Sequence, residues 1–163
     1  MSFSEHDFKQ CLGSFATGVT VVSTTVDKTL YGVTINAFCS VSLTPPLVLF
    51  CLDKSAHCFP AYQKASHFCI NVLNDKQKNL SLAFSGNQQE PWKYVDYTVE
   101  KSGCPIIQDN VAFLECEKWA NYDGGDHAIF VGKVLALGHH GSNANNPLIY
   151  HKSQYHKINN AVE

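Results

Sequence analysis

The sequence contains no arginine. Its twelve positive charges are all lysines, which stand against fourteen acidic residues and leave a formal net charge of −2. A nucleic-acid-binding protein needs a stripe of cations that neutralises phosphates, whereas these lysines are scattered from Lys9 to Lys157 without a basic run. The charge pattern therefore argues against nucleic acid as a partner.

Long hydrophobic runs are also missing. The longest strongly apolar run, Leu47 to Leu52, has six residues, whereas a helix that crosses a membrane needs about 20. The first residues lack the basic start and the apolar stretch of a signal peptide. The 163 residues suit one domain over 1–163. We expect a soluble, cytoplasmic protein without a membrane partner.

The seven cysteines are odd in number and irregularly spaced, which argues against a disulfide framework. Several of them lie within apolar, strand-like runs, where a reduced thiol behaves as a small hydrophobic side chain. This use of cysteine is typical of a reducing cytoplasm.

Several common catalytic signatures are absent. There is no G-x-G-x-x-G, no G-x-x-x-x-G-K-[ST] and no G-x-S-x-G, so a nucleotide would have to bind in another way. There is also no C-x-x-C and no H-E-x-x-H, and we expect solvated or singly hydrogen-bonded histidines rather than a metal site. A cysteine nucleophile paired with a histidine stays open, although no cysteine is marked locally as activated.

Most of the chain is strand-like. Runs of β-branched and aromatic residues between polar or proline breaks predict strands over 19–26, 32–43, 46–52, 67–73, 97–100, 111–121 and 127–139. Helical spacing of apolar residues predicts helices over 4–15 and 75–84, the first with Ser4 and Asp7 as a capping pair. A short helix is expected near 59–64.

These elements favour an antiparallel barrel, closed or partly closed, over a doubly wound α/β sheet. Six or seven strands are joined by short turns, and two or three short helices are too few to supply parallel crossovers. The predicted fold is mainly β with a few short flanking helices.

The stretch 32–42 interleaves small polar groups with apolar ones. A single strand there would place Thr34, Asn36, Ser40 and Ser42 on one face, which would offer hydrogen-bond donors and acceptors without net charge. An ordinary strand with its polar side toward solvent explains the same pattern, and periodicity alone favours it.

A polar turn follows the apolar run 46–52. Asp53 or Ser55 could cap the short helix near 59–64, whose free N–H groups, together with the Lys54 cation, suit a phosphate. Simple helix capping beside a solvated lysine is the commoner arrangement.

A third patch is the segment 124–132. Its two glycines, Gly124 and Gly125, allow a close backbone approach, and His127 then begins a predicted strand with a ring that can donate or accept. A hairpin tip with an incidental histidine is the alternative.

Six segments in order nevertheless resemble one family, the flavin reductase-like, FMN-binding split-barrel proteins that serve as reductase components of two-component flavin-dependent monooxygenases. The segments span nearly the whole chain and are 13–22, 32–48, 51–56, 68–73, Gly125-Asp126-His127 with Gly132, and 147–151. The resemblance implies an antiparallel, Greek-key split barrel and a homodimer that holds a flavin near the subunit interface.

The resemblance also implies which residues form the site. His127 matches the position associated with the nicotinamide and is the expected catalytic residue. The implied cofactor-binding residues are Thr34, Asn36, Ala37 and Ser42 for the ring and ribityl chain, Cys51 and Leu52 beside the ring, Asp53, Lys54 and Ser55 at the phosphate, and in addition Ser40, Phe84 and Tyr150. Family members often carry arginine where Lys54 stands. Lysine keeps the charge but loses the two-pronged fork, so phosphate binding would rely more on backbone N–H groups and Ser55.

The activity implied is hydride transfer from NADH or NADPH to FMN or FAD, with reduced flavin supplied to a separate oxygenase component. The absence of arginine favours NADH, since recognition of the 2′-phosphate of NADPH usually depends on arginine. Two alternatives remain at this point: a split barrel that binds flavin or pyridoxal phosphate without turnover, and, more remotely, a cysteine-dependent hydrolase.

Overall fold

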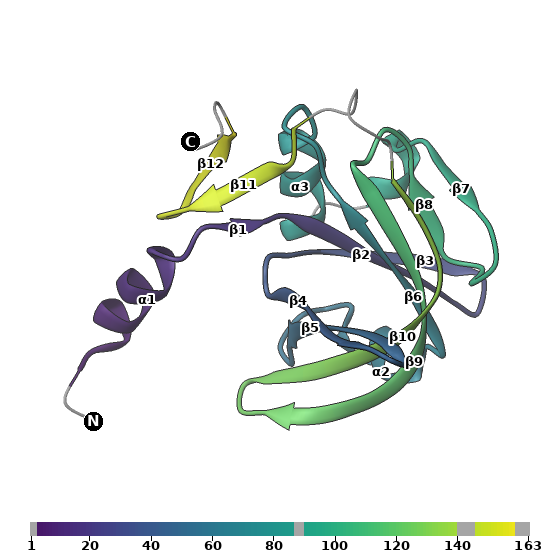
Figure 1. Cartoon of the computed structure of the whole chain (residues 1–163), viewed down its shortest axis with the longest axis horizontal. Helices are drawn as coiled ribbons and strands as arrows, with labels where there is room; N and C mark the ends of the chain where they lie inside the picture. Colours follow the sequence, from purple (N-terminus) through teal and green to yellow (C-terminus); the bar gives the residue numbers. More distant parts are fainter. Residues whose placement is uncertain (1–2, 87–89, 140–145, 159–163) are drawn as a thin grey trace.

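A seven-stranded antiparallel sheet forms the body of the molecule in the computed structural model, which describes residues 3–86, 90–139 and 146–158 (Figure 1). The strand order is β3-β2-β6-β9-β10-β5-β4, so the two edge strands, β3 and β4, are consecutive in the chain. The strands are β2 (Thr20–Val26), β3 (Thr29–Ile35), β4 (Phe38–Leu43), β5 (Pro46–Asp53), β6 (His67–Val72), β9 (Ala112–Gly124) and β10 (His127–His139).

Smaller elements flank this sheet. A three-stranded sheet joins β1 (Thr17–Gly18), β11 (Leu148–His151) and β12 (Gln154–Lys157), and a two-stranded sheet joins β7 (Tyr97–Val99) to β8 (Pro105–Ile107). The helices are α1 (Glu5–Gly13), α2 (Phe59–Lys64) and α3 (Lys78–Ser85), with a 3₁₀ turn, η1, over Pro91–Tyr94. The predicted mainly β fold with few short helices is confirmed.

The sheet curls around an aromatic core. Phe50 of β5 stacks on Phe130 of β10 with ring centroids 5.1 Å apart, and it meets the edge of Phe68 of β6 at 5.0 Å. Strand β5 shows which face points into the core, because its alternate residues Val48, Phe50 and Leu52 are buried while the residues between them are less so. Burial of alternate residues on both halves of the sheet encloses the core and leaves the barrel split between β3 and β4.

Helix α1 begins as predicted and then buries nothing. Ser4 and Asp7 form a capping box, in which each side chain accepts from the other residue's backbone N–H. None of the nine helical residues is buried, and the helix stands away from the barrel (Figure 1). Its apolar side chains Phe8 and Leu12 are 51% and 57% exposed, and Phe15, which follows the helix, is 77% exposed.

One predicted strand is wrong. The run 32–43 is not a single strand, because the chain turns at Asn36–Ala37 between β3 and β4, and the pairing of β4 shifts between Ser40 and Ser42. The four polar side chains of this run therefore do not share one strand face. The short strands β1, β8, β11 and β12 were not predicted, because segments of two to four residues carry too little alternation to be recognised.

Candidate functional site

A cavity of about 410 Å³, called here the Tyr150 cavity, lies where the end of β3, helix α3 and the β11–β12 hairpin meet. Three residues expected to bind cofactor, Thr34, Asn36 and Tyr150, line it together. Thr34 is held from behind, since its hydroxyl donates to the Ser81 carbonyl at 2.7 Å and thereby ties β3 to α3. The full lining is Val19, Thr34, Asn36, Leu82, Ser85, Tyr150, Ser153 and Tyr155.

Sequence reasoning missed Tyr155, Ser153 and Ser85 in this cavity. Tyr150 and Tyr155 are direct partners across the β11–β12 hairpin, and their rings lie 5.3 Å apart at 63°. The Tyr155 hydroxyl also lies 3.0 Å from Ser81 Oγ. A detectable signal was the tyrosine pair around the turn that contains Ser153, where the left-handed backbone marks a tight hairpin.

None of the residues that line the Tyr150 cavity carries a formal charge. Hydroxyl groups, one amide and two tyrosine rings instead offer donors, acceptors and flat apolar surface. Such a lining suits a neutral planar ring with hydrogen-bonding edges better than it suits an anion or a metal ion.

The turn after β5 is built differently from the prediction. Asp53 accepts from the backbone N–H and the hydroxyl of Ser55, each at 2.7 Å, and these hydrogen bonds lower the pKa of the Asp53 carboxyl. Neither residue caps α2, whose N-cap is Cys58 and makes no side-chain cap bond. The predicted capping of α2 by Asp53 or Ser55 is therefore wrong, whereas phosphate binding at this turn stays a prediction.

Lys54 has a different partner from the one expected. Its ammonium group pairs with the Asp123 carboxylate and donates to the Gly125 carbonyl, both at the tip of the β9–β10 hairpin. The backbone N–H of Lys54 also donates to the Asp126 carbonyl at 2.9 Å. The lysine thus fastens the polar turn to the hairpin tip.

His127 lies beside this turn, directly opposite Asp53 in the pairing of β10 with β5. Its Nδ1 is 2.7 Å from an Asp126 carboxylate oxygen. In the neutral ring a proton on Nδ1 would be donated to that carboxylate, which leaves Nε2 as a free acceptor. The geometry therefore presents one defined edge of the imidazole to a ligand, and Gly125, with φ +82°, makes the turn that allows it.

The remaining expected residues lie on β4 and β5. Cys51 N–H donates to the Ala37 carbonyl at 3.0 Å, so the β3–β4 turn is joined to β5. Cys51 is half-buried, and Ser40 and Ser42 lie on β4 near the sheet edge. Leu52 is 2% exposed and packs in the barrel core, so only its backbone can face a ligand.

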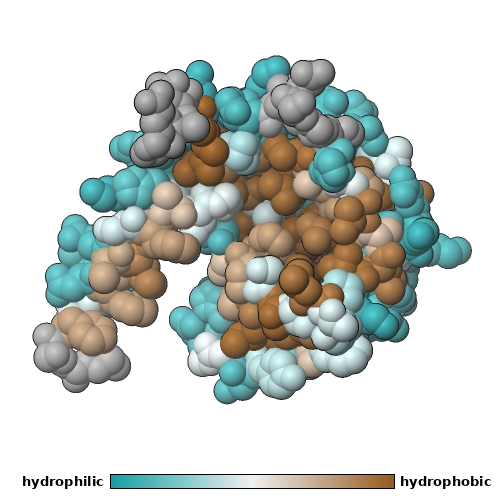
Figure 2. All heavy atoms as spheres, viewed as in Figure 1, coloured by the Kyte–Doolittle hydropathy of each residue, from teal (hydrophilic) through white to brown (hydrophobic). Residues whose placement is uncertain are grey.

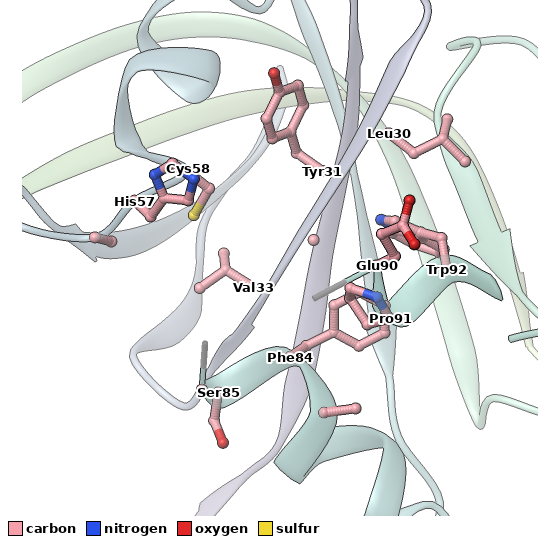
Figure 3. A pocket seen from close by; sticks show the side chains of 14 residues that line it. Leu30, Tyr31, Val33, His57, Cys58, Phe84, Ser85, Glu90, Pro91 and Trp92 are labelled. Carbon is pink, nitrogen blue, oxygen red and sulfur yellow. The ribbon is translucent and has the colours of Figure 1, made fainter. Parts of the chain in front are cut away.

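Phe84 lies in a second cavity of about 510 Å³, called here the Trp92 cavity (Figure 3). Figure 3 places His57 and Cys58 on one side of it and Glu90, Pro91 and Trp92 on the other, with Phe84 between them. Ser85 lines both cavities, which therefore meet at the end of α3. Of the residues that the sequence singled out, Phe84 alone lines this second cavity.

The cysteine thiols argue against the hydrolase alternative. Burial raises the pKa of five of them, whereas an activated cysteine nucleophile has a lowered pKa. These are Cys51, Cys58, Cys69, Cys104 and Cys116.

Within the described ranges no group of three or more histidine, cysteine or acidic side chains could hold a metal ion. No helix among the described residues is long and apolar enough to cross a membrane.

Comparison with known proteins places this geometry in a family. The family model "flavin reductase like domain" matches residues 12–159. The chain is 34% identical over 148 residues to a flavin-dependent monooxygenase reductase subunit, HsaB, of Mycobacterium tuberculosis, covering 91% of this chain and 79% of that protein. It is 42% identical over 136 residues to the FMN reductase (NADH) SmoA of Agrobacterium fabrum, covering 83% and 78%.

A solved structure agrees. The NADH:FAD oxidoreductase SgcE6 of Streptomyces globisporus, in complex with NAD and FAD fragments, superposes with a TM-score of 0.92 at 30% identity, covering 98% of this chain and 96% of that one. The match extends along the sequence and through the whole fold. The chain belongs to the flavin reductase-like domain family.

Proposed function

We propose that the protein is an NADH-dependent flavin reductase that supplies reduced flavin to a separate monooxygenase. The observation that carries this proposal is an uncharged, tyrosine-lined cavity in a chain that also presents a histidine at the tip of the β9–β10 hairpin and matches the flavin reductase-like model over residues 12–159. Relatives named as NADH-dependent FMN reductase and as a monooxygenase reductase subunit support both parts of the activity.

The residues present fit a flavin. Thr34, Asn36 and Tyr150 bring donors, acceptors and an aromatic face to one cavity that is wide enough for ring-sized ligands. A bound flavin would supply the redox chemistry, accepting a hydride from the nicotinamide. The chain's own task is to bind and align the two rings and to exclude water between them.

The phosphate of the flavin would meet the turn 53–55. Ser55 is exposed and offers a hydroxyl. The Lys54 ammonium can contact an anion only if its ion pair with Asp123 breaks or if it binds both groups at once. Asp123 therefore competes with the phosphate for the same cation, and the strength of this competition sets the contribution of Lys54 to flavin affinity.

His127 positions the nicotinamide in this proposal. Because Asp126 engages Nδ1, the Nε2 edge is left to contact the carboxamide of the nicotinamide. His127→Ala should slow flavin reduction at least about tenfold, the size expected for losing one hydrogen bond in alignment, while flavin affinity changes little. His139→Ala, at the other end of the same strand, is the matched control.

One experiment tests the activity itself. Purified protein is titrated with FMN and with FAD, and NADH is then added without oxygen while flavin absorbance is followed near 450 nm. Saturable binding followed by bleaching is expected. Binding without bleaching would instead establish a flavin-binding protein that does not turn over, and absence of binding would overturn the assignment. Loss of activity after thiol alkylation, in a protein that binds no flavin, would favour the hydrolase.

We further infer that the chain is a homodimer. Its accessible surface is 10204 Å², whereas a compact monomer of 18.1 kDa exposes about 8,000 Å². The excess of about 2,000 Å² is more than one partner contributes to a standard interface, about 800 Å². Figure 2 shows apolar side chains on α1 and across the facing side of the barrel, with a hollow between them. A second copy of the chain is the occupant that covers both.

The oligomeric state tests this inference directly. Leu12→Asp should convert the protein to a monomer at micromolar concentration in sedimentation velocity, because a charge would replace an apolar side chain in the interface. Gln10→Asp on the same helix should leave the dimer intact. A native protein that sediments as a monomer throughout this range would refute the inference.

A further inference from the structure

We propose that His151 and His156 form a binding site for a divalent transition-metal ion on the outer face of the β11–β12 hairpin. The ions concerned are those that favour imidazole nitrogen, such as Ni²⁺, Cu²⁺ and Zn²⁺. The two histidines alternate along their strands with Tyr150 and Tyr155, so they lie on the opposite face of the hairpin from the Tyr150 cavity. The proposal therefore does not depend on what that cavity binds.

The hairpin brings the two rings together. His151 lies opposite Gln154, two residues before His156 on β12, so the histidines are diagonal neighbours on one face of two paired strands. Their ring centroids are 5.8 Å apart, with 59° between the ring planes. Nitrogens lie on the rim of each ring, so two that turn toward each other come closer than the centroids. Two nitrogens that each bind one metal ion at about 2.0–2.1 Å are about 3 Å apart, and small ring rotations would close the pair around the ion.

The backbone beneath the pair is fixed on both sides. Lys152 and Ser153 form the turn of the hairpin with φ values of 47° and 61°, and two positive φ values are the mark of a type I′ turn, whose twist matches that of paired strands. The other edge of β11 pairs with β1, beside which the hairpin lies in Figure 1, and the Lys152 N–H donates to the Gly13 carbonyl at 2.9 Å. Ligands that are already held side by side lose little freedom on binding, so the second nitrogen adds affinity as a chelate.

Both rings are open to an ion. His156 is exposed and His151 is half-buried. Among the residues that the structure describes, no side chain is hydrogen-bonded to either ring, whereas Asp126 engages Nδ1 of His127 at 2.7 Å. Water would complete the coordination shell beyond the two imidazoles.

The charges near the pair predict which ions bind. His156 lines a cavity of about 340 Å³ that also carries Asp75, Lys78 and Lys157. The two ammonium groups outnumber the carboxylate, so local charge does not attract cations and affinity has to come from the imidazole nitrogens. Mg²⁺ and Ca²⁺, which prefer oxygen ligands, should therefore not bind here.

Isothermal titration of the full chain, without an affinity tag, tests the site. Ni²⁺ is the probe, because thiolates select Cu⁺ and Zn²⁺ and the thiols of Cys11 and Cys39 are exposed. One Ni²⁺ should bind per chain, and Mg²⁺ should give no saturable binding. His151→Ala and His156→Ala should each weaken Ni²⁺ binding at least about tenfold, because either change removes the chelate.

Two control variants separate loss of a ligand from damage to the hairpin. Gln154→Ala changes the residue opposite His151, and His139→Ala removes an exposed histidine from β10. Both should bind Ni²⁺ as the wild type does. Wild-type affinity in either His151→Ala or His156→Ala would show that the histidines bind ions separately, and this would overturn the proposal.

Hydrogen exchange and thermal unfolding locate the ion. Ni²⁺ should slow amide exchange in the segment 148–157 and raise the melting temperature of the wild type, because it binds the folded hairpin. Neither effect should occur in His156→Ala. Protection confined to another segment would place the ion elsewhere, and a lower melting temperature would show preferential binding to the unfolded chain. Either result would refute the site, whatever the flavin titrations give.

Discussion

Gly32→Ala is the substitution whose effect follows most directly from the structure. The added methyl would lie 2.6 and 2.7 Å from two carbons of the Phe84 ring and 2.8 Å from the Trp92 ring, where ordinary contacts begin near 3.4 Å. Phe84 is 4% exposed, so its ring has little space to retreat. Overpacking of this kind costs about 1–3 kcal/mol of unfolding free energy. For a chain of this length, a loss of about 2 kcal/mol lowers the melting temperature by about 4–8 °C.

The assay is thermal unfolding at one protein concentration, because melting of a dimer depends on concentration. Gly18→Ala is the matched control, since nothing lies within 4 Å of the methyl that it adds. A Gly32→Ala protein that melts within 1 °C of the Gly18→Ala control would refute the packing argument.

Three further outcomes are expected. Gly132→Ala should destabilise more than Gly32→Ala in the same melts, because its methyl would lie 2.3 Å from the Phe68 ring in the barrel core; equal melting temperatures would contradict this. Asp123→Asn should tighten FMN about three- to tenfold by releasing Lys54, without changing riboflavin affinity, in parallel fluorescence titrations; a matching gain for riboflavin would contradict it. Burial raises the pKa of Cys116 to about 12, so this thiol alone should lower the free energy of unfolding in urea by about 1.4 kcal/mol per pH unit between pH 9 and 12. Cys116→Ala should lessen the measured slope by about that amount while the other buried thiols, such as Cys69, keep the remainder, and an unchanged slope would count against this cause.

Helices and strands with a regular spacing of apolar residues over six or more positions could be predicted from the sequence. The strands at 46–52 and 67–73 and the helices near 59–64 and 75–84 appear within a few residues of their expected bounds, because burial of one face imposes a regular spacing on the sequence. The run 32–43 failed for a related reason. Both halves have strand-like composition, and the turn at Asn36–Ala37 lacks the glycine or proline that marks most turns.

The site residues, too, could be predicted only in part. Resemblance singled out Thr34, Asn36 and Tyr150, and the fold brings them into one cavity although Tyr150 lies more than a hundred residues from the other two. Tyr155 was missed because its role depends on being opposite Tyr150 across a short hairpin. The ion pair of Lys54 with Asp123 was also missed, since it joins two turns that meet only when β5 pairs with β10.

The sequence by itself determined the mainly β fold class, the family and the residue types available for binding, because periodicity and motifs are local properties of the chain. Only the tertiary structure decided that Lys54 pairs with Asp123, that two cavities meet at Ser85, and that α1 buries none of its residues. These three features depend on which distant segments pack together. Pairing partners and packing distances arise from the closure of the sheet, which no stretch of sequence encodes alone.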